Sequence, residues 1–141
     1  MLPLLLALAA QSPAENPTRA AMDAFRARVE SITAYEKAQS ESLPLLRDGQ
    51  LDAAIAHLIA AVPENDRTAA HAFLLGNLLF DLAPDAAARF HEEAYRKEPK
   101  LPPVVYEWAL DHHRAHRYRE AEELYASLIQ GGLFAAPPVH A

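Results

Sequence analysis

Two stretches decide the fold: residues 72–99, AFLLGNLLFDLAPDAAARFHEEAYRKEP, and residues 105–128, VYEWALDHHRAHRYREAEELYASL. Small residues recur through them and the segment before them at an even spacing, at Ala54, Ala87 and Ala121. Leu75-Gly76 has its counterpart at the same interval along the chain in Trp108-Ala109. The sequence therefore predicts a repeat of about 34 residues with two helices in each repeat.

Helix signals continue from residue 17 onward, and strand signals are missing. Apolar residues at intervals of three and four, from Met22 to Tyr35, predict one long helix over 17–42, and Pro44 and Gly49 are expected to end it. Thr68 or Asp66 can cap a later helix. Further helices are expected from Leu51, over 69–82 and 85–98, from Pro102 to about Ala115, and from Tyr118 to Gly131.

This pattern resembles the tetratricopeptide repeat (TPR), which has Trp, Leu-Gly and Tyr on its first helix and Ala, Phe and Pro on its second. The matching residues are Ala72, Leu75, Gly76, Leu79, Ala87, His91 and Pro99 in the middle repeat, Val105, Trp108, Ala109, His112, Ala121 and Tyr125 in the third, and Leu51, Ala54, Leu58 and Ala61 in the first. The resemblance covers about residues 35–131, as two good repeats and one degenerate one. It implies an all-α fold of antiparallel helix pairs stacked as a short right-handed TPR-type solenoid, with the long helix at its N-terminus.

Residues 1–10, MLPLLLALAA, form an apolar run too short to cross a membrane. The run resembles the apolar part of a secretory signal, although no Lys or Arg precedes it. An apolar tail packed on the body, or a start site placed too far downstream, would also account for it. The expected organisation is a signal peptide over 1–10, a linker over 11–16, the N-terminal helix over 17–42, TPR-like repeats over 43–131 and a tail over 132–141. If the N-terminal signal is real, we expect the protein to be exported, as a periplasmic or secreted protein. Without a real signal, we expect it to be cytoplasmic.

The composition excludes several functions. The 141 residues include no Cys and only 4 Gly, which leaves neither thiol chemistry nor a glycine-rich phosphate loop. A net charge of −6 has the wrong sign for a nucleic-acid binder. We therefore expect no nucleic-acid partner and no cofactor. We also expect no integral membrane segment in the mature chain.

Three histidines in the sequence HHRAH at 112–116 could hold a metal ion. His112 and His116 lie one turn apart on a helix face, a spacing that suits zinc, but no third ligand follows at a fixed distance. In the repeat, His112 falls at a core position and His116 in a turn, so packing explains both. The paired carboxylates Glu92-Glu93 and Glu122-Glu123 are interpreted as a solvated face.

A stripe on the first helix of the middle repeat recurs at the same positions on the first helix of the third repeat. In proteins of the TPR family this face lines a concave groove for peptides, and exposed aromatic side chains suit such ligands. Asn77 would fix the peptide backbone and Arg114 would pair with a carboxylate. The expected groove residues are Phe73, Asn77, Phe80, Asp81, Tyr106, Leu110, His113 and Arg114.

An alternative is that the N-terminal helix folds over the groove and makes Phe73 and Tyr106 part of the core. The favoured function is a non-catalytic protein- or peptide-binding scaffold, with self-association left open. The competing hypotheses are a histidine-based metal-binding protein or enzyme, and a truncated part of a longer solenoid.

Overall fold

The computed structural model describes residues 17–130. The expected signal peptide, linker and C-terminal tail lie outside these residues, as does the end of the last helix beyond Gln130. Within them the chain forms only helices and no strand, which confirms the all-α class. The elements are α2 (Pro17–Glu30), α3 (Glu36–Arg47), α4 (Leu51–Ala60), the short 3₁₀ helix η2 (Glu64–Asp66), α5 (Ala69–Leu79), α6 (Pro84–Lys97), α7 (Pro102–Arg114) and α8 (Tyr118–Gln130).

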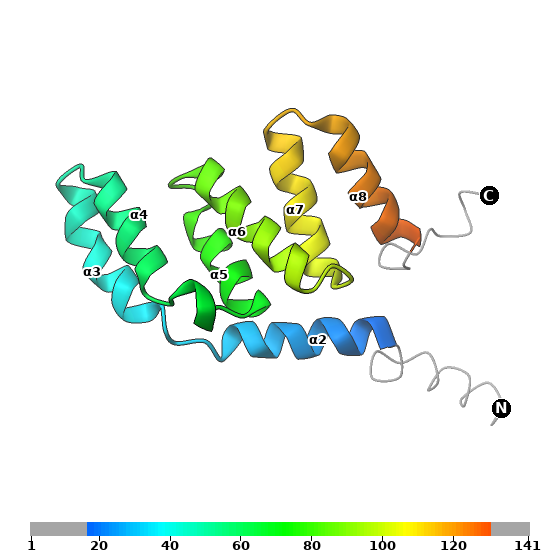
Figure 1. The fold of residues 1–141 in the computed structure, drawn as a ribbon, viewed down its shortest axis with the longest axis horizontal. Helices are drawn as coiled ribbons and strands as arrows, with labels where there is room; N and C mark the ends of the chain where they lie inside the picture. The colour runs from blue at the N-terminus through cyan, green and yellow to red at the C-terminus, as the bar shows by residue number, and fades with distance from the viewer. Residues whose placement is uncertain (1–16, 131–141) are drawn as a thin grey trace, which may run out of the picture.

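Helices next to one another in the chain pack together. The pairs α3 with α4, α5 with α6 and α7 with α8 form helical hairpins, and α6 also packs on α7 (Figure 1). Thr68 caps α5 as expected, because its hydroxyl accepts a hydrogen bond from the His71 backbone N–H. Prolines begin α6 and α7, where a missing N–H costs nothing.

The single helix expected over 17–42 is wrong. The chain leaves the helix after Glu30, where the Ser31 hydroxyl donates a hydrogen bond to the carbonyl of Arg28. A second helix, α3, starts at Glu36 and contains Pro44 instead of ending there. The apolar spacing predicted one continuous helix because Ile32 and Tyr35 still pack into the core. The segment between α2 and α3 that carries them is not helical.

Two turns have a left-handed backbone. Gly49 has φ +76° and His116 has φ +64°. Each precedes by five positions an alanine in the first turn of the following helix, Ala54 or Ala121, and both of these alanines are buried. Glycine adopts this conformation freely, whereas a histidine is strained in it.

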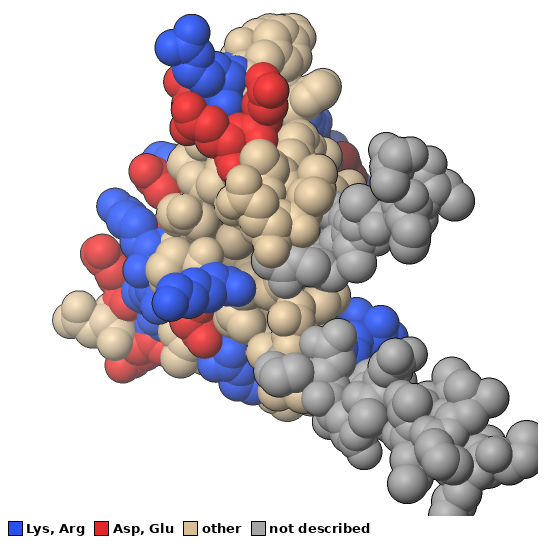
Figure 2. All heavy atoms as spheres, turned by 90° about the vertical axis from the view of Figure 1, so that its right-hand side faces the viewer, with Lys and Arg blue, Asp and Glu red and all other residues tan. Residues whose placement is uncertain are grey.

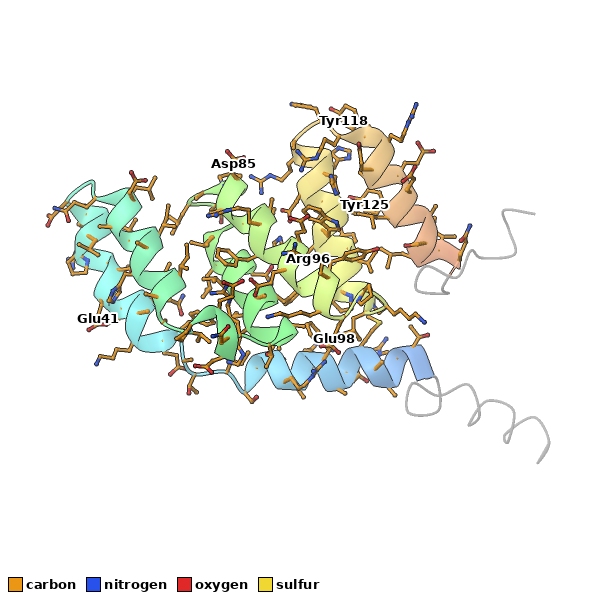
Figure 3. All side chains as sticks on the ribbon, in the orientation of Figure 1. Glu41, Asp85, Arg96, Glu98, Tyr118 and Tyr125 are labelled. Carbon is orange, nitrogen blue, oxygen red and sulfur yellow. The ribbon has the colours of Figure 1, made fainter. Side chains whose placement is uncertain are left out.

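The helix α2 lies across the ends of α5, α6 and α7 (Figure 1). Phe25 is fully buried there, with its ring edge-on to Phe73 at 5.2 Å between centroids. Arg28 pairs with Glu98 at the end of α6, at 3.1 Å, and Figure 3 shows Glu98 next to α2. No helix within residues 17–130 is long and apolar enough to cross a membrane.

Candidate protein-binding surface

The expected groove residues do not form one continuous surface. Phe73, Asn77 and Phe80 project from α5 toward His91 of α6, and Arg114 of α7 covers the Phe80 ring at 3.9 Å. Asp81 is exposed just after the end of α5. Tyr106, Leu110 and His113 lie on α7, where Tyr106 and His113 contact rings of α8 instead. Seven of the eight residues therefore divide into two groups, one toward His91 and one on α7 beside α8, and Asp81 belongs to neither.

The first group surrounds a buried hydrogen-bonded network. His91 is fully buried; its Nδ1 donates to Oδ2 of Asp111 at 2.5 Å, and its Nε2 lies 2.9 Å from Oδ1 of Asn77. The rings of Phe73 and Phe80 flank the imidazole at 6.1 and 6.4 Å between centroids. His91 thus links α5, α6 and α7, and the rings of Phe73 and Phe80 pack against it, while Asn77 and Arg114 remain exposed.

The charges of His91 and Asp111 act on the carboxyl group of Glu107. Burial raises the pKa of the Glu107 carboxyl, His91 lowers it and Asp111 raises it. Sequence reasoning gave no functional role to His91, Glu107 or Asp111. The signal for His91 was present, because an imidazole stands at a position where the repeat pattern has an aromatic ring that packs into the core.

The second group faces outward beside α8. Of this group, His113 borders a hollow of about 490 Å³ together with Tyr118, Tyr125 and Ile129. The hollow is mainly apolar and includes one carboxylate, Glu122. Tyr118 is 55% exposed, Ile129 50% and Tyr106 37%. Tyr118 and Tyr125 project from α8 in Figure 3, and Figure 2 shows uncharged side chains in the middle of this side of the molecule.

We call the residues Tyr106, Leu110, His113, Tyr118, Tyr125 and Ile129 the α7–α8 face. The rings of Tyr106 and Tyr125 lie 6.1 Å apart, and those of His113 and Tyr118 lie edge-on at 5.3 Å. Burial, followed by the charges of Tyr106 and Glu107, raises the pKa of Tyr125. The Tyr125 phenol is therefore neutral at neutral pH. The face combines aromatic and apolar side chains, a composition enriched at the centre of protein interfaces.

The histidines of 112–116 occupy the places that packing predicts. His112 is buried, with its ring 4.1 Å from that of Trp108, and its Nδ1 accepts a hydrogen bond from Arg117 Nε at 2.8 Å. His116 lies in the turn beside the Tyr118 hydroxyl, at 2.7 Å. Across residues 17–130, no three His, Cys, Asp or Glu side chains form a group that could hold a metal ion.

The interpretation of Glu93 as part of a solvated face is wrong. Its side chain is only 13% exposed, and both of its oxygens accept hydrogen bonds from Arg67 at 2.9 Å. Arg67 lies far earlier in the chain, after the 3₁₀ helix. A sequence periodicity cannot bring two such residues together.

Comparison of the chain with protein-family models, with curated proteins and with solved structures found no match. The class that the fold itself defines is an all-helical protein of packed neighbouring helices with a network of buried polar groups at its centre.

Proposed function

We propose that this protein is a non-catalytic protein-binding module of the TPR type and that it binds its partner on the α7–α8 face. The observation that carries the proposal is an internal correspondence. Three residues of the face have counterparts one repeat earlier in the chain, and side chains of other helices cover those counterparts. Tyr106 corresponds to Phe73, His113 to Phe80, and Tyr125 to His91.

The covering helix in the earlier repeat is α7, assisted by α2. Asp111 of α7 accepts the hydrogen bond from His91, Arg114 lies over Phe80, and Val104 packs with Ala94 of α6. Phe25 of α2 covers Phe73. Among the described residues no further helix plays these roles for Tyr118, Tyr125 and Ile129, which stay exposed or half-buried.

The partner that best fits this face is therefore an α-helix with one amphipathic side, supplied by another protein. By correspondence with Val104, Asp111 and Arg114, it would carry a branched apolar residue, then a carboxylate two helical turns later and a cation almost one turn after that. The carboxylate would accept a hydrogen bond from the Tyr125 hydroxyl, and the cation would lie over an aromatic ring. Helices recognised through an apolar stripe are a common mode of binding.

Of the eight expected groove residues, only the three on α7 that lie beside α8 are kept in the proposed site. Tyr106, Leu110 and His113 remain proposed contact residues. Phe73, Asn77, Phe80 and Arg114 are better explained by the packing of α5 against α6, α7 and α2, and the exposed Asp81 is not retained. The histidine-based metal site receives no support from the placement of His112 and His116.

We also propose that the protein is exported, on the strength of residues 1–10, which lie outside the described part. The mature chain should then begin at or close to Ala10, and intact-mass measurement on protein from its native host tests this. A mature chain that keeps Met1 would contradict export without affecting the proposed binding face.

A photo-crosslinking amino acid placed in the native host tests the binding face. Ala126 lies in the hollow of the α7–α8 face, and Leu43 of α3 is an exposed apolar control at 57%. We expect the probe at 126 to capture one discrete protein through a helical segment, and the probe at 43 to capture none. Equal capture from both positions would contradict the proposal, and capture of a second copy of the chain would replace the partner helix with self-association.

A further inference from the structure

A second hollow lies on the other side of α7, between it and α6. Its volume is about 390 Å³, within the range of pockets that hold small ligands. The pocket has an apolar part, formed by Trp108, Ala88, Ala115 and Pro84. Its charged border consists of three arginines, Arg89, Arg114 and Arg117, and three carboxylates, Asp85, Glu92 and Asp111. Figure 3 places Asp85 at the start of α6, beside the end of α7. The proposed partner helix does not use this pocket, although two of its bordering residues, Asp111 and Arg114, also contact His91 and Phe80.

The guanidinium of Arg117 is held in place by a neutral base. Its Nε donates to Nδ1 of His112 at 2.8 Å, and the His112 ring lies against Trp108. Burial, and then the charge of Arg117, lowers the pKa of His112, so this imidazole is uncharged at neutral pH and accepts the hydrogen bond. The bond orients Arg117 but leaves its positive charge uncompensated.

The guanidinium of Arg114 is held by an aromatic ring. It lies 3.9 Å from the centroid of Phe80, a stacking that orients the planar group without neutralising it. Within residues 17–130, no carboxylate oxygen lies within ion-pair distance of Arg114 or Arg117. The α7 side of the pocket thus carries two oriented cations with no internal counter-ion.

The carboxylates that border the pocket have other partners available. Asp111 is buried and hydrogen-bonded to His91. Asp85 and Glu92 lie four positions before and three positions after Arg89 on α6, spacings at which helical side chains pair in solution. The first turn of α6, beginning at Pro84, also lies at the pocket, and the helix dipole favours negative charge there.

We propose that the pocket between α6 and α7 binds a small amphipathic anion. Its head group, a carboxylate or a phosphate, pairs with Arg117 and Arg114, and its apolar body lies on Trp108 and Ala88. This site is separate from the α7–α8 face, because Trp108 and Tyr106 project from opposite sides of α7. Either site can therefore fail while the other holds.

Trp108 makes the proposal directly measurable, since it is the only tryptophan in the chain. The probes are hexanoate and hexyl phosphate, which do not absorb where tryptophan does, with hexanol as the neutral control of the same length. We expect a saturable change in Trp108 fluorescence and a matching calorimetric heat, with dissociation constants on the order of 1 mM or tighter. The two anionic probes distinguish a carboxylate from a phosphate head group.

The matched variants are Arg117→Gln and Arg119→Gln, which remove the same charge at two nearby positions. Arg119 is exposed on α8 and does not border the pocket. We expect Arg117→Gln to weaken binding of the anion on the order of tenfold and Arg119→Gln to leave it unchanged, with circular dichroism confirming that both fold. Neither spectral change nor heat with either anion up to about 10 mM, equal binding of hexanol, or equal weakening by the two variants would overturn the proposal.

Discussion

The imidazole of His91 occupies the space that a side chain at Gly76 would need. A Cβ built on Gly76 would overlap the ring at its Cδ2 and Nε2 atoms, while the other side of the ring is fixed by Asp111. Gly76 lies on α5 and His91 on α6 of the same hairpin. The side chain at one position therefore limits the size of the side chain at the other. This pair sets how closely α5 approaches α6.

The pair predicts a non-additive mutational result. Gly76→Ala should destabilise the protein by about 1–3 kcal/mol, because the added methyl group overpacks a position where the ring cannot move away. In a His91→Ala background the same change should cost much less, since the ring is gone and alanine favours helix. Chemical denaturation of the four proteins measures this cycle, and equal costs in both backgrounds would show that the two residues do not constrain each other.

The two groups of expected groove residues should respond differently to truncation. Phe73→Ala should lower the free energy of unfolding by about 2 kcal/mol or more, because the ring packs between Phe25 and His91. Tyr106→Ala should cost about 1 kcal/mol or less, since this side chain is exposed. Thermal denaturation followed by circular dichroism compares the two, and an equal loss would mean that both rings belong to the core.

Acid should weaken the ion pair between Arg67 and Glu93. Hydrogen bonds from Arg67 hold the pKa of Glu93 below its ordinary value despite burial. A carboxyl group with a depressed pKa stabilises the folded state at pH values above its unfolded pKa of about 4.3. This stabilisation is lost as the pH falls through the lower pKa of the folded state.

Glu93→Gln should therefore reduce stability at pH 7 and flatten its decline between about pH 5 and pH 3, as measured by urea denaturation at several pH values. Glu123→Gln, a control on the surface of α8, should leave the profile unchanged. A steep acid decline that persists undiminished in Glu93→Gln would assign the pH dependence to other carboxyls.

Strain at His116 should be removable. His116→Gly places at this turn the residue that already stands at Gly49, and should stabilise the protein by about 1 kcal/mol because glycine adopts positive φ without a steric penalty. His116→Ala loses the same contact with Tyr118 but keeps the penalty, which makes it the matched control. A glycine variant no more stable than the alanine variant would mean that the turn is unstrained.

Three of the helices from 69 onward, α5, α6 and α7, could be predicted from the sequence because their starts are marked locally. Thr68, Pro84 and Pro102 give their starts, and the small residues in register give their packing faces. The break after Glu30 could not be predicted, because Ile32 and Tyr35 continue the apolar spacing through a segment that is not helical.

The candidate surface could be predicted only in part, for a related reason. Tyr106 and His113 lie on a face that helical spacing defines, and both are exposed. The hydrogen bond between His91 and Asp111 depends on the register of two different helices, α6 and α7. The same kind of long-range placement joins Arg67 to Glu93, and neither pairing follows from a local pattern.

We propose that the α7–α8 face binds a partner helix. The most direct test is the dissociation constant of the protein captured from position 126, measured with wild type, Ile129→Glu and Leu43→Glu. Both substitutions replace an exposed apolar side chain by a carboxylate, at positions 50% and 57% exposed. We expect Ile129→Glu to weaken binding by on the order of thirtyfold, as for a truncated hot-spot residue, and Leu43→Glu to bind like wild type. Unchanged binding by Ile129→Glu would show that the partner helix does not bind on this face.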